Sequence, residues 1–160
     1  ENLLKRTFKI FESFKNIKLI VKLHPAKYDS EYIKKLINQL DPNITIYHTE
    51  PIQKILEDCD TVLNIHTEVL PSTAVLDALV MGKPVMNISL VDENYNFQFI
   101  KDNAVMQVTY KSDLEKNLKT ILYDENFRKE LIENAQKHLQ SYLSNQGKAS
   151  KHFAEILNSL

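Results

Sequence analysis

Seven polar residues have the side chains and the positions that chemistry would need. They follow apolar runs typical of strands or open the helix that comes next, and they are Lys22, His24, His66, Thr67, Ser72, Thr73 and Asp77. A histidine near its usual pKa can act as an acid or a base, and its protonated form can neutralise phosphate charge. Lys22 and His24 share an orientation, because residues two apart in a strand point to the same side. His24 can equally serve to order the turn at Pro25, and the residues alone leave both interpretations open.

Ser72 and Thr73 stand at the start of a predicted apolar helix. A helix N-terminus presents unpaired N–H groups and a partial positive charge, which suits phosphate, and two hydroxyls can add hydrogen bonds. Serine is also a good N-cap residue, so the pair has a purely structural interpretation as well. Asp77 lies one turn further on, and a carboxylate in an apolar stretch needs a partner. That partner is either a ribose hydroxyl or a backbone or lysine contact.

Composition argues against several classes of function. The 20 Lys and Arg balance the 21 Asp and Glu to a net charge of −1, which does not favour duplex nucleic acid as the main partner. The two glycines, Gly82 and Gly147, cannot form a glycine-rich dinucleotide loop or a P-loop. The single cysteine, Cys59, is expected to be an apolar filler, and no spacing of His, Asp or Glu predicts a metal site. The histidines expected on the surface are His48, His138 and His152.

Apolar periodicity predicts an alternation of helices and strands. Helices are expected over 2–15, 30–40, 51–56, 72–81, 114–122, 127–139 and from about 148, and strands over 17–23, 44–47, 61–65, 84–88 and 104–108. Strands that alternate with helices in units of about 30 residues form a parallel sheet. We therefore predict a single α/β domain over 1–160. Its architecture would be a doubly wound, Rossmann-like parallel sheet of about five strands, with helices on both faces.

Ligands of an open α/β sheet bind beyond the carboxyl ends of its strands, where most of the seven polar residues fall. One connection is unusually long, because 90–103 separates two strands and carries Tyr95, Phe97 and Phe99. A loop of that length in a compact domain is often functional. A surface excursion whose aromatic rings return to the core is the equal alternative.

Several short segments follow one another in a characteristic order. They are Leu-Ile-Val-Lys-Leu-His-Pro (19–25), Pro51-Ile-Gln-Lys-Ile-Leu56, Asp60-Thr-Val-Leu-Asn64, Ser72-Thr-Ala-Val-Leu-Asp-Ala-Leu79 and Gly82-Lys-Pro-Val85. This order, over roughly 17–122, resembles the C-terminal, nucleotide-binding half of GT-B-fold glycosyltransferases. Within that group the chain is most similar to enzymes that build cell-surface polymers. These include CDP-glycerol glycerophosphotransferases and capsule, sialic acid or Kdo transferases.

The resemblance implies a role for each matching residue. His24 would match a histidine that lies by the donor phosphates and takes part in the transfer, with Lys22 as electrostatic support. The binding residues would be Ser72 and Thr73 for phosphate, Asp77 for the ribose, and His66 and Thr67 in a loop near the donor. The glycine-rich turn that the family has before its Ser pair is absent here. The first strand of this half and the acceptor domain are also absent, so we expect a piece of a longer enzyme.

The sequence therefore predicts the donor-binding domain of a glycosyltransferase or glycerophosphotransferase. Its donor would be a nucleotide-activated sugar or polyol phosphate, CDP- or UDP-linked, used in cell-surface polysaccharide synthesis. We expect no cofactor, no metal and no nucleic-acid partner. The missing acceptor domain would complete the enzyme, and the fragment alone would be inactive. We expect a cytoplasmic location, with peripheral association at the inner face of the membrane through other parts of the full-length protein.

Two alternatives belong to the same fold. A nucleotide-sugar 2-epimerase would usually carry a glycine-rich, doubly acidic segment where 72–77 lies, and this sequence lacks one. A non-catalytic scaffold domain would bind no nucleotide. A receiver-type signalling domain fits less well, because Lys22, His24 and Asn64 occupy positions where it needs acidic residues.

Overall fold

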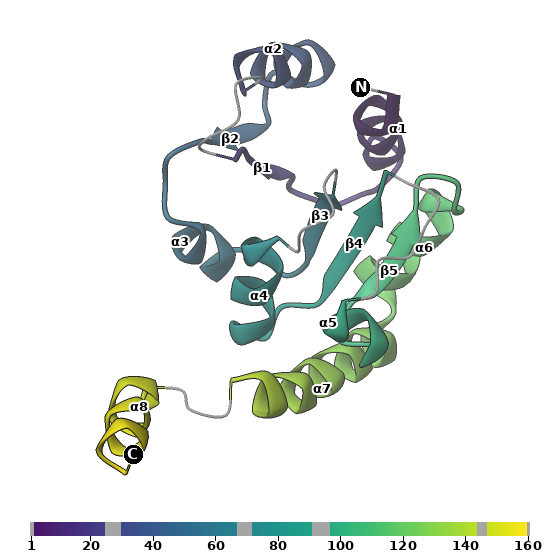
Figure 1. Cartoon of the computed structure of the whole chain (residues 1–160). Coiled ribbons are helices and arrows are strands. Elements are labelled where there is room, and N and C mark those ends of the chain that lie inside the picture. The colour runs from purple at the N-terminus through teal and green to yellow at the C-terminus, as the bar shows by residue number, and fades with distance from the viewer. Residues whose placement is uncertain (1, 25–29, 67–71, 91–96, 144–146, 160) are drawn as a thin grey trace.

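The computed structural model describes residues 2–24, 30–66, 72–90, 97–143 and 147–159. Helices and strands alternate along most of the chain (Figure 1). The strands are β1 (Ile20–Lys22), β2 (Thr45–Tyr47), β3 (Val62–His66), β4 (Val85–Ser89) and β5 (Met106–Thr109). The helices are α1 (Asn2–Phe11), α2 (Ser30–Leu40), α3 (Ile52–Glu57), α4 (Thr73–Val80), α5 (Gln98–Lys101), α6 (Leu114–Tyr123), α7 (Glu125–Tyr142) and α8 (Ala149–Asn158).

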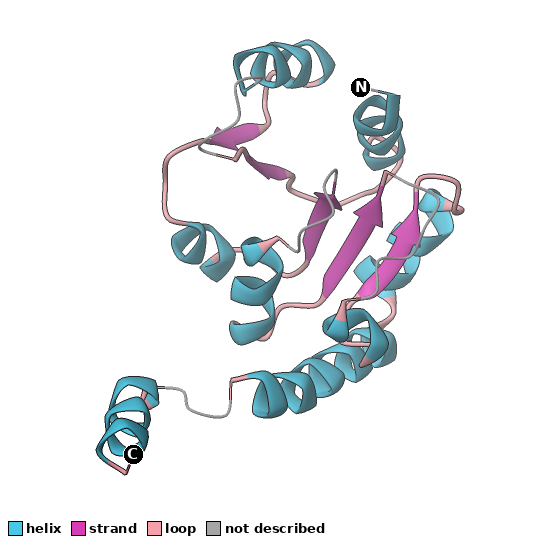
Figure 2. Ribbon diagram, in the orientation of Figure 1, coloured by secondary structure: helices cyan, strands magenta, loops and turns pink. Residues whose placement is uncertain are grey.

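The five described strands form two parallel sheets. β1 pairs with β2, and β3, β4 and β5 form a second sheet in that order (Figure 2). The parallel pairing confirms the predicted α/β class. The hydrogen bonds do not form the single sheet that the sequence predicted, because no ladder joins β1 to β3 among the described residues. β1 and β2 have only three residues each, so any ladder between β1 and β3 would contain few hydrogen bonds.

Alternate residues of β4 face two different hydrophobic clusters, because successive side chains of a strand point to opposite faces. Val85 belongs to the cluster formed with α4 and α7, whose buried members include Val75, Ala78, Leu79 and Ala135. Met86 and Ile88 belong to the cluster formed with α6 and α7, whose buried members include Leu114, Leu118, Ile121 and Leu131. Helices therefore cover both faces of the three-stranded sheet. A third cluster surrounds Phe8, Leu23 and Ile37 beside β1 and β2.

The C-terminal end of α4 is formed as the sequence predicted. Gly82 has a φ of 67°, the left-handed conformation that glycine adopts without a steric penalty. Its N–H donates to the carbonyl of Leu79 (3.0 Å), and the N–H of Lys83 donates to the carbonyl of Ala78 (2.9 Å). This pair of bonds is a Schellman motif, which ends the helix and turns the chain into β4.

The long connection between β4 and β5 contains the short helix α5, which the sequence analysis did not predict. α5 ends in the same kind of motif, with Asn103 at a φ of 51° and a bond from the N–H of Ala104 to the carbonyl of Phe99 (2.9 Å). Phe99 and Ile100 pack against the cluster of α4 and α7. Within 97–103 the aromatic side chains therefore pack back toward the core, which was one of the two predicted alternatives. Tyr95 lies outside the described residues.

None of the residues of α8 is buried, a property that it shares with the four-residue helix α5. Its apolar side chains Phe153, Ile156 and Leu157 are exposed, and Figure 1 shows the helix at the end of the chain, apart from both sheets. Among the described residues, no helix combines the length and the apolar character that crossing a membrane requires.

Candidate functional site

Lys22 lies at the carboxyl end of β1. Its ammonium group donates to the carbonyl of Leu23 (2.6 Å) and to the carbonyl of His48 (2.8 Å), which follows β2. Lys22 therefore joins the ends of the two strands. The partly buried ammonium forms no ion pair within 4.0 Å in the described part of the chain, and its charge is met by these carbonyl dipoles and by the nearby carboxylate of Glu50.

The two candidate histidines follow β1 and end β3. His24 is exposed, two residues after Lys22. His66 is the last residue of β3 and is in register with Ser89 of β4, which is completely buried and is itself in register with Thr109 of β5. Thr67, the next candidate, lies outside the described residues.

The N-terminus of α4 is the part of the site that the structure defines best. Ser72 is the N-cap residue in an extended conformation (φ −73°, ψ 126°), but its side chain makes no capping hydrogen bond. Within the described part of the chain, neither the Ser72 nor the Thr73 hydroxyl donates or accepts a hydrogen bond. Ser72 is half-buried and Thr73 is exposed, so both hydroxyls are available at the end of the helix dipole.

Asp77 has a partner that the sequence analysis did not consider. The side-chain amide of Gln53, on α3, donates to Oδ1 of Asp77 on α4 at 3.1 Å. This bond connects two neighbouring helices across their outer sides, whereas Leu56 of α3 and Val75 of α4 share the buried cluster. A ribose, a backbone group and a lysine were the predicted partners of Asp77, and the observed partner is a neutral amide.

These residues fall into two groups. Lys22 and His24 belong to the end of the two-stranded sheet, while Ser72, Thr73 and Asp77 belong to α4 beside the three-stranded sheet. Within the described residues no hydrogen bond joins the two groups. A ligand that used all of them would have to span the two sheets.

A row of amide side chains crosses the three-stranded sheet, and the sequence analysis did not identify it. Asn64, Asn87 and Gln107 occupy matching positions on β3, β4 and β5. Asn64 donates to Asn87 (2.5 Å), and Asn87 donates to Gln107 (2.6 Å). Asn87 is 1% exposed, so these bonds satisfy polar groups that burial would otherwise penalise. The row lies two residues before His66, Ser89 and Thr109, and it fixes the register of the strands that end at the site.

The prediction that His138 lies on the surface is wrong. Its side chain is buried on α7, where Nδ1 lies 2.7 Å from Oδ2 of Asp102. The ring stacks on Tyr142 (5.4 Å between centroids) and meets Phe99 edge-on (6.4 Å). The hydrogen bond from His138, and next that from Gln98, lowers the pKa of Asp102. A buried histidine needs such a partner, and only tertiary packing brings it there.

The predictions for the other two surface histidines and for Cys59 have different outcomes. His152 is exposed as predicted. His48 is half-buried, and its buried Nε2 has no hydrogen-bond partner among the described residues. Cys59, expected to be an apolar filler, is half-buried, its Sγ donates to the carbonyl of Ile55 (3.2 Å), and its burial raises the pKa of the thiol. Glu50, beside Lys22, has a pKa lowered by hydrogen bonds from its own N–H and from the N–H groups of His48 and Thr49.

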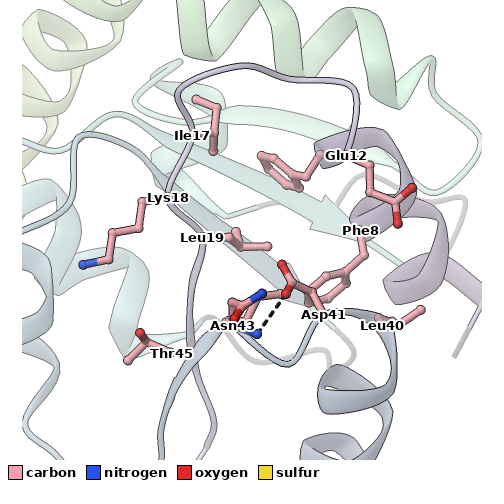
Figure 3. Close-up of a pocket in the computed structure, with 11 residues that line it drawn as sticks. Phe8, Glu12, Ile17, Lys18, Leu19, Leu40, Asp41, Asn43 and Thr45 are labelled. Atoms are coloured by element: carbon pink, nitrogen blue, oxygen red, sulfur yellow. Dashed lines mark hydrogen bonds between the residues drawn. The ribbon is translucent and has the colours of Figure 1, made fainter.

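One hollow lies away from these residues, beside β1 and β2. It has a volume of about 330 Å³ and is lined by residues of α1 and by those that precede or begin β1 and β2, including Phe8, Ile17, Leu19, Asp41 and Asn43 (Figure 3). It therefore opens at the amino ends of β1 and β2, opposite the edge where α/β sheets bind ligands. The hydroxyls and cations that could hold an anion lie at the carboxyl edge instead.

Within the described ranges, no group of three or more His, Cys, Asp or Glu side chains could hold a metal ion. No protein-family model, curated protein or solved structure matches the chain.

Proposed function

We propose that this chain is the donor-binding domain of a GT-B-like transferase. Its substrate is a nucleotide-activated sugar or polyol phosphate, and the enzyme builds cell-surface polysaccharide. In this proposal, the two described sheets are parts of one doubly wound sheet with the strand order β2-β1-β3-β4-β5. The nucleotide binds at the switch point between β1 and β3. The acceptor domain is supplied by another part of the protein, which works at the cytoplasmic face of the membrane.

The observation that carries the proposal is the N-terminus of α4. Two hydroxyls, those of Ser72 and Thr73, lie there without hydrogen bonds to any described residue, at the positive end of the helix that follows β3 in the chain. A nucleotide phosphate would receive hydrogen bonds from both hydroxyls and from the first N–H groups of the helix. The positive charge of Lys22, at the carboxyl end of β1, favours an anion at the same edge.

The proposed chemistry is transfer with departure of the nucleotide. The oxygen of the acceptor hydroxyl forms a bond to the donor group as the bond between that group and the nucleotide phosphate breaks. The leaving phosphate takes the electron pair, and the hydroxyl proton passes to a base that the acceptor domain would supply. Positive groups stabilise that developing charge. His24, exposed next to Lys22, is the proposed catalytic residue, and the α4 N-terminus holds the leaving phosphate.

Titration calorimetry of the folded chain with CDP, UDP, CMP, GDP and ADP tests the proposal. We expect one nucleotide to bind selectively. The double change Ser72→Ala/Thr73→Ala should weaken that binding roughly tenfold or more, because a hydrogen bond to a charged group contributes about 1.5–3 kcal/mol. His24→Ala should weaken it less, since the proposed role of His24 is in the transfer.

Thr120→Ala is the matched control, because it removes a hydroxyl from the exposed side of α6. It should leave nucleotide affinity unchanged. Failure of every nucleotide to bind to the folded chain would contradict the proposal and favour a non-catalytic scaffold domain. Equal losses for Thr120→Ala and the double variant would show that the α4 hydroxyls have no special role.

A further inference from the structure

We propose that the hollow at the amino ends of β1 and β2 is a second binding site, and that it takes a small organic cation, an ammonium group on an apolar body. The hollow has a volume of about 330 Å³ and is the space shown in Figure 3. That volume falls in the range of small-molecule sites, about 300 to 1,000 Å³. The inference does not depend on the proposed nucleotide site, which would lie at the opposite edge of the strands.

Two carboxylates line the hollow, each at an unfavourable place on its helix. Glu12 directly follows α1, and its N–H donates to the carbonyl of Phe8 (3.1 Å). Asp41 directly follows α2, and its N–H donates to the carbonyl of Ile37 (2.9 Å). The C-terminal end of a helix carries a partial negative charge, so the helix dipole repels a carboxylate there. Two helix ends and two carboxylates therefore give this hollow a negative potential.

The two carboxylates lack a cation partner in the described part of the chain. Neither Glu12 nor Asp41 forms an ion pair within 4.0 Å there. Lys18 is the only basic residue among the described residues that line the hollow, and its side chain extends away from both carboxylates (Figure 3). Oδ1 of Asp41 accepts from the N–H of Asn43 (2.9 Å), but an asparagine at position 41 could accept the same bond. The turn after α2 therefore does not require the negative charge.

The walls of the hollow are apolar, which fits an amine with a hydrocarbon body better than a metal ion. Phe8 is buried, and Phe11, Leu40 and Ile44 are half-buried. A ligand that covers these side chains removes apolar surface from water, and a phenylalanine ring also attracts a cation. Among the described residues, no group of three His, Cys, Asp or Glu side chains could hold a metal ion.

The test is a titration of the whole chain with two amines and their neutral isosteres, followed by NMR of the backbone amides. The pairs are 2-phenylethylamine with 2-phenylethanol, and 3-methylbutylamine with 3-methylbutanol. We expect at least one amine to bind roughly tenfold or more tightly than its alcohol, because hydrogen bonds to charged groups are the stronger ones. The shifts should change at Phe8, Leu19 and Ile44, which line the hollow, and stay constant at Thr73 on α4.

Two double variants separate the site from a general effect of charge. Glu12→Gln/Asp41→Asn should weaken the amine roughly tenfold or more and leave the alcohol nearly unchanged, so that their affinities become similar. Glu130→Gln/Glu133→Gln removes two carboxylates from the exposed side of α7 and is the matched control. It changes the net charge equally and should leave the preference for the amine intact.

The unfolding temperature of the free chain gives an independent readout. Glu12→Gln/Asp41→Asn should keep or raise it, because the variant removes two charges that the helix dipoles repel. A lower unfolding temperature would show that the carboxylates stabilise the free fold, and it would overturn the inference. Failure of both amines to bind, equal affinity of each amine and its alcohol, or equal losses in the two double variants would also overturn it. None of these outcomes bears on nucleotide binding.

Discussion

At the scale of single residues, the contacts of His138 decide how the connection between β4 and β5 is held. The ring bonds Asp102, which caps α5, and the side chain of Asn134, one turn earlier on α7, donates to the carbonyl of Asn103 (3.4 Å). α7 therefore fixes the end of α5 just before β5 begins. Sequence alone suggested a surface histidine, because His138 lies on a predicted helix with no partner identifiable from the sequence.

The Asp102 pKa gives a pH-dependent prediction. Its carboxylate form is favoured in the folded state, so it stabilises the fold above the unfolded pKa of about 3.9, and this stabilisation disappears as the pH falls through the lowered folded value. We expect Asp102→Asn to be less stable than the unaltered chain at pH 7, and the difference to shrink below about pH 4. Denaturant unfolding at several pH values measures both quantities.

Glu133→Gln, on the exposed side of α7, controls for the loss of one negative charge. A stability difference for Asp102→Asn that stays constant from pH 7 to pH 3 would show that the carboxylate form does not contribute.

At the scale of the elements, two kinds of helix start are present. Asp113 and Asp124 cap α6 and α7, and their carboxylates accept from the N–H groups of Lys116 (3.1 Å) and Phe127 (3.0 Å). Ser72 occupies the same position at α4 without such a bond. A capping residue that does not cap is a stronger indication of a ligand than the residue type alone, and only the structure supplies that distinction.

This contrast predicts different costs for two similar substitutions. Asp124→Ala should lower the free energy of unfolding by about 1 kcal/mol, the usual value of a capping hydrogen bond. Ser72→Ala should change it by less than about 0.5 kcal/mol, as for an ordinary surface position. Denaturant unfolding of both variants checks this. A large loss for Ser72→Ala would mean that the hydroxyl caps α4 in solution, and the structural interpretation of the Ser72 and Thr73 pair would then be preferred.

At the scale of the whole molecule, the three-stranded sheet and its two clusters form the stable centre, while α8 adds no buried residue. α7 contributes to both clusters, through Ala135 on one and Leu131 on the other. Loss of packing at the centre should therefore affect the entire fold, and loss at α8 should not.

Two leucine substitutions test this division. Leu118 is 0% exposed and Leu157 is 54% exposed. We expect Leu118→Ala to cost about 2–5 kcal/mol, because it removes buried methyl groups and leaves a cavity. Leu157→Ala should stay within about 0.5 kcal/mol. Thermal or denaturant unfolding measures both, and a large cost for Leu157→Ala would show that α8 packs against another surface in solution.

The sequence by itself determined the alternation of helices and strands, the parallel pairing and the position of α4 between β3 and β4. Periodicity and turn residues such as Gly82 act over a few neighbours, so they can be recognised without a structure. Tertiary structure alone decided which polar groups meet. Gln53 reaches Asp77 across 24 positions, His138 reaches Asp102 across 36, and Lys22 reaches the carbonyl of His48 across 26. The division into two sheets likewise depends on how β1 lies relative to β3. These outcomes arise from packing between distant segments, and no local pattern encodes them.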